Sequence, residues 1–344
     1  MTQMPVSISN PPSPEAETPI LDVRGLTKYF PVGTFIKTRQ VHAVEDASFT
    51  VKRGQVVALV GESGSGKTTT IRLIARLIPV TRGDIFFDGA DILKTESRQA
   101  SLAYRRKVQL VFQDPFASLN AVHNIEHHLA RPLIIHKKTG SRADLHDRVC
   151  ELLETVGLNP AAEIARRYPH QLSGGQRQRV AIARALAVDP ELILADEPIS
   201  MLDVSIRMDI LNLIAHLKEE RNIAYVYITH DLASARYIGD LIMVMYAGHM
   251  VEGGESEEIM GSPAHPYTQL LLSAVPDPHA GLRTGKDIGT HGEVPSLIDP
   301  PPGCPFAARC MKVMDICRQV MPEPTDVNPD HWVRCHLFDT GTSS

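Results

Sequence analysis

The chain has 344 residues, of which 43% are hydrophobic, and a formal net charge of −5 at neutral pH. This length suits one large domain with a smaller appendage, or two modest domains. The slightly acidic balance argues against a broad basic face, so no nucleic-acid partner is expected. No uncharged apolar stretch reaches the roughly 18 residues that span a bilayer, and the start lacks the layout of a signal peptide. We therefore expect a cytosolic protein that reaches a membrane, if it does, by docking on another chain.

Residues 1–18 are rich in proline and serine and predict a disordered leader. Over residues 19–260, β-branched runs alternate with helical patterns, which predicts an α/β domain with a mostly parallel sheet core. The helical pattern at about 101–187 predicts an α-helical subdomain that interrupts this sheet. A Pro-, Gly- and His-rich linker is predicted at about 276–302, within a C-terminal region at 261–344. The predicted strands are Val56–Val60, Val108–Phe112, Leu192–Ala195, Ala224–Ile228 and Leu241–Met245.

A complete G-x-x-x-x-G-K-[ST] loop follows the first predicted strand and precedes a helical pattern. Such a loop turns backbone N–H groups toward a phosphate, and the helix adds the positive end of its dipole. Lys67 places a charge near the β- and γ-phosphates, and the Thr68 hydroxyl suits Mg²⁺. A glycine-rich turn is the alternative, but the flanking strand and helix favour a nucleotide site. Its predicted ligands are Gly61, Ser63, Gly64, Ser65, Gly66, Lys67, Thr68 and Thr69.

Polar residues follow three other predicted strands. Asp196 and Glu197 end the strand that starts at Leu192, at the sheet edge where α/β proteins bind ligands. Asp196 suits the Mg²⁺ site, and Glu197 is placed to polarise the water that attacks the γ-phosphate. His230 is a candidate hydrogen-bond partner of the γ-phosphate, although a lone histidine is more often structural. Gln113 is a candidate contact of Mg²⁺ or of water through its amide.

A second anion-binding nest is predicted at Ser173, Gly174, Gly175 and Gln176, which precede a strongly helical run. One nucleotide does not need two phosphate nests from the same chain. We therefore expect two chains that face each other, so that the nest of one closes over the glycine loop of the other.

With these motifs assembled, the chain resembles the ATPase subunits of ABC transporters from about Leu21 to Gly254. The resemblance implies the ABC type of P-loop NTPase fold, with ATP and Mg²⁺ bound. The matching motifs are the P-loop at 61–68, the Q-loop glutamine Gln113, the signature at 172–176, the Walker B segment at 192–197, the D-loop at 200–203 with Asp203, and the switch histidine His230.

The same resemblance assigns roles to single residues. Glu197 is the general base, and His230 senses or stabilises the γ-phosphate. Phe30 best fits the aromatic residue that stacks on adenine, with Tyr29 as the neighbouring alternative. Met201 departs from the alanine that is usual in the D-loop, which changes packing at the dimer seam without removing a catalytic group.

Three segments resemble the oligopeptide/dipeptide import branch of this family: Phe112 to Asn120, His265 to Pro276, and Gly303 to Cys310. The resemblance implies a subunit that powers import from the cytoplasmic side of the cell membrane, as a peripheral protein. Its implied partners are a second, different ATPase, two membrane permeases and an extracytoplasmic binding protein. Nickel or oligosaccharides are alternative cargoes. A soluble ABC ATPase of translation or DNA repair is the main rival, whereas a P-loop kinase or GTPase leaves the signature unexplained.

Four cysteines, Cys304, Cys310, Cys317 and Cys335, lie within 32 residues and predict a small Cys-rich C-terminal tail domain. Such a cluster in a cytosolic protein indicates a metal site. Their intervals lack the paired C-x-x-C of zinc knuckles, and the import-branch resemblance favours a [4Fe–4S] cluster. Zinc is the alternative metal. The simplest alternative is that the four cysteines bind no metal and pack inside a small tail.

Overall fold

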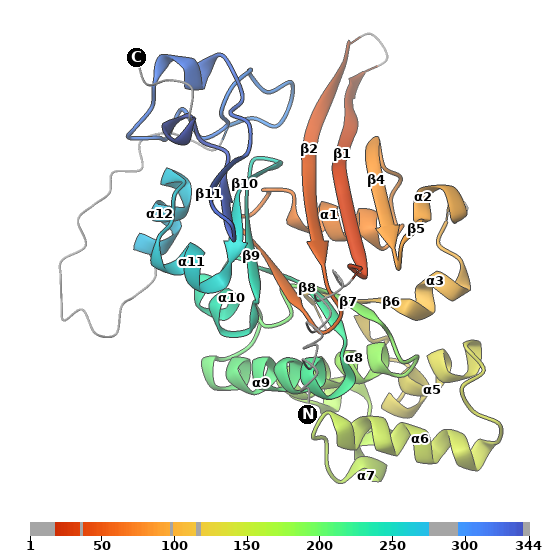
Figure 1. The fold of residues 1–344 in the computed structure, drawn as a ribbon. Helices are drawn as coiled ribbons and strands as arrows, with labels where there is room; N and C mark the ends of the chain where they lie inside the picture. Colours follow the sequence, from red (N-terminus) through yellow and green to blue (C-terminus); the bar gives the residue numbers. More distant parts are fainter. Residues whose placement is uncertain (1–17, 35–36, 97–98, 115–117, 275–294, 340–344) are drawn as a thin grey trace, which may run out of the picture.

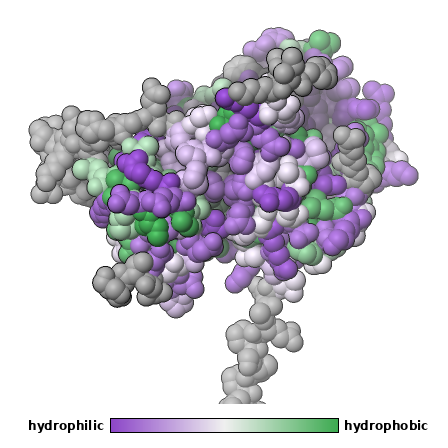
Figure 2. All heavy atoms as spheres, turned by 90° about the horizontal axis from the view of Figure 1, so that it is seen from above, coloured by the Kyte–Doolittle hydropathy of each residue, from purple (hydrophilic) through white to green (hydrophobic). Residues whose placement is uncertain are grey.

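The computed structural model describes residues 18–34, 37–96, 99–114, 118–274 and 295–339. Nearly all of the predicted leader, the Q-loop residues 115–117 and most of the predicted linker lie outside these ranges. Among the described residues, no helix is both long and apolar enough to cross a bilayer. Figure 2 shows a face on which hydrophilic side chains predominate.

The larger of two sheets contains all five predicted strands (Figure 1). Its strand order is β11-β12-β10-β9-β3-β8-β7-β6. The strands are β3 (Val56–Val60), β6 (Val108–Val111), β7 (Leu192–Asp196), β8 (Ala224–Thr229), β9 (Leu241–Tyr246), β10 (His249–Glu255), β11 (Thr325–Asn328) and β12 (His331–Val333). The buried apolar runs form the interior strands, as expected for a sheet covered on both faces.

The sheet is mixed: the five predicted strands pair in parallel, as expected, but three strands that were not predicted extend it in the antiparallel sense. Strands β6, β7, β8, β3 and β9 pair in parallel, whereas β9, β10, β12 and β11 pair antiparallel. The direction reverses at Ala247 and Gly248, whose φ angles of 46° and 87° form the two-residue turn between β9 and β10. Positive φ at both positions matches the right-handed twist of the flanking strands.

A second sheet, which is antiparallel, was not predicted. Its strands come from the segments before and after the glycine loop at 61–68. It has the order β2-β1-β4-β5, with β1 (Leu21–Thr34), β2 (Lys37–Val51), β4 (Arg82–Phe87) and β5 (Ala90–Asp91). Pairing of β1 with β2 shifts register at three places between Val23 and Tyr29. These irregularities break the apolar–polar alternation that identifies a strand in a sequence.

The helices cover the larger sheet, and Figure 1 shows α5, α6 and α7 grouped at one end of the molecule. The segment 101–187, predicted as a helical subdomain, also contains the strand β6. The helices are α1 (Lys67–Ile74), α2 (Ile92–Thr95), α3 (Leu102–Lys107), α5 (Ile125–Ile135), α6 (Arg142–Thr155), α7 (Ala161–Arg166), α8 (Gly174–Leu186), α9 (Val204–Arg221), α10 (Leu232–Ile238), α11 (Ser256–Gly261) and α12 (Pro266–Ser273). Short 3₁₀ turns lie at Pro169–Gln171, Asp315–Arg318 and His336–Phe338.

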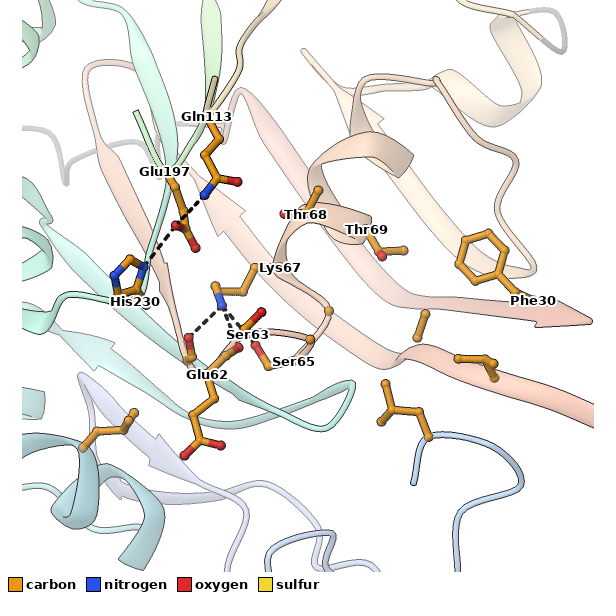
Figure 3. A pocket seen from close by; sticks show the side chains of 17 residues that line it. Phe30, Glu62, Ser63, Ser65, Lys67, Thr68, Thr69, Gln113, Glu197 and His230 are labelled. Carbon is orange, nitrogen blue, oxygen red and sulfur yellow. Dashed lines mark hydrogen bonds and ion pairs between the residues drawn. The ribbon is translucent and has the colours of Figure 1, made fainter. Parts of the chain in front are cut away.

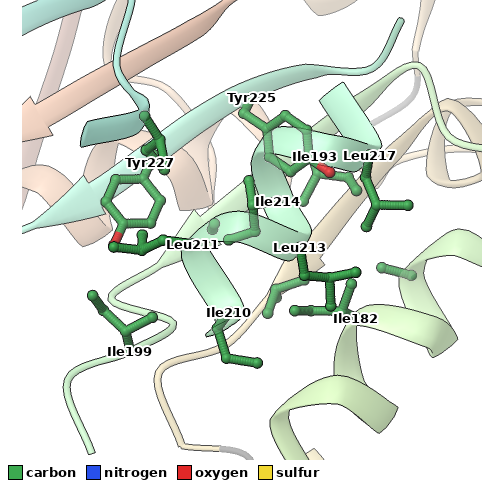
Figure 4. Packing of buried hydrophobic residues seen from close by; sticks show 14 of the residues in the cluster. Ile182, Ile193, Ile199, Ile210, Leu211, Leu213, Ile214, Leu217, Tyr225 and Tyr227 are labelled. Atoms are coloured by element: carbon green, nitrogen blue, oxygen red, sulfur yellow. The ribbon is translucent and has the colours of Figure 1, made fainter. Parts of the chain in front are cut away.

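Helix α9 packs its apolar face onto strand β8, close to the edge where functional residues are predicted. Tyr225 and Tyr227 of β8 lie beside this helix and are almost fully buried (Figure 4). The contributing side chains of α9 are Ile210, Leu211, Leu213, Ile214 and Leu217. This packing anchors the strand that leads to His230.

The C-terminal region is joined to the rest of the fold by backbone pairing, and the structure gives no support for a separate Cys-rich domain. Strand β12 pairs with β10 and extends the larger sheet. Ile298 forms a bridge with Val41 of β2, and the His42 N–H donates to the carbonyl of Leu297 at 2.8 Å. Part of the segment predicted as a linker therefore lies along the smaller sheet.

A fully buried carboxylate, Glu252 of β10, holds this region to the sheet. It accepts hydrogen bonds from the N–H groups of Ala264 and His265, at 2.6 and 3.1 Å. His331 of β12 donates to the same carboxylate through Nε2 at 2.7 Å, and both side chains are 0% exposed. Burial of this carboxylate is tolerated because each contact supplies a donor.

Glu252→Ala is expected to lower the free energy of unfolding by about 3–5 kcal/mol, because it leaves three buried donors without an acceptor. Urea unfolding followed by circular dichroism measures this. Glu257→Ala is the matched control, since Glu257 pairs with Arg236 at 2.9 Å but is 74% exposed. A change within about 0.5 kcal/mol is expected there. Equal losses in the two variants would contradict the role of the buried carboxylate.

Candidate functional site

A cavity of about 830 Å³ lies at the carboxyl ends of the parallel strands (Figure 3). It brings together side chains that follow β3, β6, β7 and β8, although they are far apart in the chain. The predicted residues that line it are Phe30, Gly61, Ser63, Gly64, Ser65, Gly66, Lys67, Thr68, Thr69, Gln113, Glu197 and His230. Open α/β sheets bind ligands at this edge.

The glycine loop needs glycine where it passes close to other backbone. Gly61 has a φ of 154°, and a Cβ there would lie 2.1 Å from the carbonyl oxygen of Met245. Gly66 caps α1 with a φ of 109°, and its Cβ would lie 2.5 Å from the carbonyl oxygen of Ala43. A side chain at either position would displace the loop, so these glycines determine its path.

Lys67 lies inside this loop and is 5% exposed. Its Nζ donates to the carbonyls of Gly61 and Glu62, at 2.7 and 2.9 Å. Burial lowers the pKa of Lys67, and the carboxylates of Glu197, Asp196 and Glu62 oppose that shift. The ammonium group is thus held beside the loop amides, where a phosphate chain would lie.

Thr68 lines the cavity and pairs with Asp196, a predicted ligand that is not itself among the lining residues. The Thr68 hydroxyl donates to Asp196 Oδ1 at 2.9 Å. Burial raises the pKa of Asp196, while the hydrogen bond from Thr68 opposes the shift. A hydroxyl and a carboxylate oxygen are the donor types that Mg²⁺ takes beside nucleotide phosphates, so these residues fit the ion.

Glu197 is held from two sides by predicted site residues. Gln113 Nε2 lies 3.2 Å from Glu197 Oε2, and His230 Nδ1 lies 3.0 Å from the same oxygen (Figure 3). The backbone of Glu197 has a φ of 44°, and its N–H donates to the Ile228 carbonyl. A non-glycine residue in this left-handed region is strained, and the contact with β8 holds it there.

Phe30 lies at the end of the cavity opposite Glu197 and His230 (Figure 3). Its neighbour Tyr29 is turned to other partners. The Tyr29 ring stacks on His42 at 4.0 Å, and its hydroxyl donates to Glu45 at 2.7 Å. The structure therefore favours Phe30 over Tyr29 as the aromatic side chain of the cavity.

The second nest does not line the cavity of its own chain. Ser173 caps α8, where its hydroxyl accepts from the Gln176 N–H and Gln176 Oε1 accepts from the Ser173 N–H. Gly175 is tightly packed, since a Cβ there would lie 2.5 Å from Ile206 of α9. Gly174 and the D-loop residue Asp203 lie in the same part of the molecule, away from the cavity lining.

Five lining residues were absent from the predicted set: Val41, Ala43, Glu62, Leu271 and Leu297. Glu62 belongs to the recognised loop but occupies one of its variable positions. The two leucines come from α12 and from the segment beside β2, and no local pattern near them indicates a nucleotide site.

The four C-terminal cysteines line one small cavity beside α12, together with His265 and His336. Burial raises the pKa of Cys304 to about 12 and that of Cys335 to about 11. None of the described cysteines forms a disulfide. Within the described ranges, no group of three or more His, Cys, Asp or Glu is arranged to hold a metal ion. The geometry therefore does not support the predicted iron–sulfur or zinc site.

Comparisons with known proteins agree with the fold and the cavity. A family model described as ABC transporter matches residues 44–200. The dimeric structure of MJ0796, a bacterial ABC transporter cassette, is 32% identical and superposes with a TM-score of 0.61, covering 69% of this chain and 98% of that one. The structure of cbiO1 from Clostridium perfringens is 27% identical, with a TM-score of 0.61 over 71% of this chain and 91% of that one. These features define an ABC-type ATPase.

A second family model, described as Oligopeptide/dipeptide transporter, C-terminal region, matches residues 251–317. The dipeptide transport ATP-binding protein DppF of Haemophilus influenzae is 44% identical over 94% of this chain and 98% of its own length. The oligopeptide transport ATP-binding protein AppF of Bacillus subtilis is 44% identical over 93% and 97%. The chain therefore belongs to the ATP-binding proteins of the oligopeptide/dipeptide ABC transporter family, which confirms the resemblance.

Proposed function

We propose that this chain binds and hydrolyses ATP to power the import of oligopeptides or dipeptides. The observation that carries the proposal is the convergence of Lys67, Glu197 and His230 on one cavity, from three strand ends of an ABC-type fold. The names of DppF and AppF supply the cargo class. Nickel or oligosaccharides are the alternative cargoes.

In the proposed site, the loop from Gly61 to Thr69 holds the phosphates and Phe30 stacks on the adenine. Thr68, Asp196 and Gln113 are the proposed residues around Mg²⁺, which neutralises charge on the phosphate oxygens when bound. Glu197 accepts a proton from the attacking water. Gln113 and His230 orient this carboxylate through their hydrogen bonds.

We propose a two-chain arrangement in which Ser173, Gly174, Gly175 and Gln176 close over ATP on the partner, and Asp203 lies at the seam. In support, these residues lie outside the cavity lining of their own chain. The proposed partners are a second, different ATPase, two permeases and an extracytoplasmic binding protein. The complex would place this chain at the cytoplasmic side of the membrane, as a peripheral subunit. We propose that this chain consists of an ATPase domain at 19–260 and a C-terminal region at 261–344.

Lys67→Ala is expected to abolish peptide uptake and to weaken ATP binding by about 10²-fold or more, because the loop loses its charge on the phosphates. Radiolabelled dipeptide and oligopeptide uptake in a deletion strain tests the cargo, and calorimetry with MgATP tests the site. Lys138→Ala is the control, since Lys138 pairs with Asp189 away from the cavity. Normal peptide uptake with the Lys67 variant would contradict the proposed ATP site. Uptake of nickel or oligosaccharides in place of peptides would contradict the proposed cargo.

The [4Fe–4S] cluster stays a prediction that the family resemblance alone supports, with Zn²⁺ as the alternative. If it is correct, anaerobically purified protein is brown and contains about four irons and four sulfides per chain. Cys310→Ser is then expected to abolish the metal and leave ATP binding intact. Cys150→Ser is the control, because Cys150 lies on α6 away from the other cysteines. A colourless protein without iron would contradict the cluster, and one zinc per chain would replace it.

A further inference from the structure

The C-terminal region contacts the phosphate-binding loop directly, at Glu62. The guanidinium of Arg309 donates to both oxygens of the Glu62 carboxylate, at 2.9 and 3.0 Å. The Glu62 N–H donates to the hydroxyl of Tyr267 at 2.8 Å, and its carbonyl accepts from Lys67 Nζ at 2.9 Å. Three polar groups of this loop residue thus have partners, and two of those partners come from the C-terminal region.

Arg309 is held firmly in this position. Its side chain is 9% exposed and lies against the rings of Tyr246 and Phe306, at 5.7 and 5.8 Å. Its Nη1 also donates to the Tyr246 hydroxyl at 3.2 Å. A planar guanidinium that lies over two rings and binds a carboxylate with both arms loses little further freedom, so the contact defines where the carboxylate lies.

The contact also changes the charge that the loop presents. Glu62 lines the same cavity as Lys67, and its carboxylate acts on the Lys67 ammonium electrostatically. An unpaired carboxylate there would repel the phosphates of ATP across a partly desolvated space. Arg309 neutralises it, and at the same time Tyr267 fixes the peptide N–H of the same residue.

We propose that Arg309 is a positioning residue of the ATPase site, which neutralises Glu62 and holds the phosphate-binding loop, so that tight ATP binding requires the C-terminal region to be docked. This inference rests on the proposed nucleotide site around Lys67. It adds a residue 247 positions away from the loop, next to Cys310 in a segment without any nucleotide-binding motif.

The test measures MgATP affinity of the full-length chain by calorimetry. Arg309→Gln is expected to weaken binding by about five- to tenfold, because the carboxylate loses its counter-charge. The double variant Arg309→Gln with Glu62→Gln is expected to return to within about twofold of the original affinity, since the repelling charge is gone. In the assembled transporter, Arg309→Gln should raise KM for ATP and leave kcat unchanged, which marks lost ground-state binding.

Arg334→Gln is the matched control. Arg334 also lies in the C-terminal region, is 11% exposed and pairs with a carboxylate of the ATPase domain, Asp46, at 2.5 Å. Asp46 does not line the cavity, so unchanged ATP affinity is expected. Arg309→Lys keeps the positive charge but cannot bind both carboxylate oxygens as the guanidinium does, so it should bind ATP with intermediate affinity. This variant replaces Arg309→Gln in the test if the glutamine variant does not fold.

Two results would overturn the inference: unchanged affinity in folded Arg309→Gln, or a double variant as weak as the single one, which would indicate a merely structural role. Lys67→Ala separates this failure from failure of the site itself. If Lys67→Ala abolishes binding while Arg309→Gln does not weaken it, the nucleotide site stands and only the role of Arg309 is wrong. If Lys67→Ala binds ATP normally, the site assignment fails and the inference with it.

Discussion

Glu197→Gln is expected to slow ATP hydrolysis by about 10²–10⁴, the usual contribution of a positioned general base. ATP binding should persist, because Lys67 and the loop amides are unchanged and an amide can still accept hydrogen bonds from Gln113 and His230. The variant should therefore accumulate closed dimers with ATP bound. Steady-state phosphate release from the assembled complex, together with nucleotide binding, measures both effects.

Glu191→Gln provides the control for this experiment. Glu191 immediately precedes β7, whereas Glu197 immediately follows it, and Glu191 pairs with Arg53 and Lys107 at the opposite end of the strand. The same chemical change there should leave hydrolysis unaffected. Unchanged turnover in Glu197→Gln would show that another group activates the water.

Ser173→Arg is expected to reduce hydrolysis at the partner's P-loop by about 10²–10³, the usual cost of losing a preorganised donor at a developing charge. ATP binding to the P-loop of the same chain should be unaffected, because Ser173 does not line that cavity. Mixing one variant subunit with an intact partner, and trapping nucleotide on each, resolves the two sites.

Ser141→Arg is the matched control, because Ser141 caps α6 as Ser173 caps α8, with its hydroxyl accepting from an N–H three residues on. Each substitution removes a helix cap worth about 1 kcal/mol, so a difference between them reports the contact with ATP. A crosslink that places Ser173 beside Lys67 of its own chain would contradict the two-chain model.

The glycine loop and the strands before each site residue were predictable because their signals are local. A loop that must turn its amides inward needs glycine where φ is positive, as at Gly64 and Gly66, and these positions appear directly in the sequence. Runs such as Val56–Val60 are apolar because both faces of the strand are buried. Parallel strands align their carboxyl ends, so the sequence alone predicts Glu197 and His230 near Lys67.

Other features depended on pairing between distant segments. The smaller sheet was not predicted because bulges in β1 interrupt the alternation of apolar and polar residues that is typical of a strand. The short strands β11 and β12 carry too few residues for a pattern, and pairing of β12 with β10 and of β11 with β12 stabilises them. The strands β10, β11 and β12 were not predicted from the sequence, so the antiparallel part of the sheet appeared only in the structure.

The sequence by itself thus determined the class of protein, the glycine loop and the residues that follow each predicted strand. The tertiary structure decided which neighbours complete that site: Leu297 beside Val41, and Arg309 on Glu62. The physical reason is one of range. Backbone conformation and burial produce sequence patterns within a few residues. The ion pair between Glu62 and Arg309, which are 247 positions apart, depends instead on the path of the whole chain between these two residues.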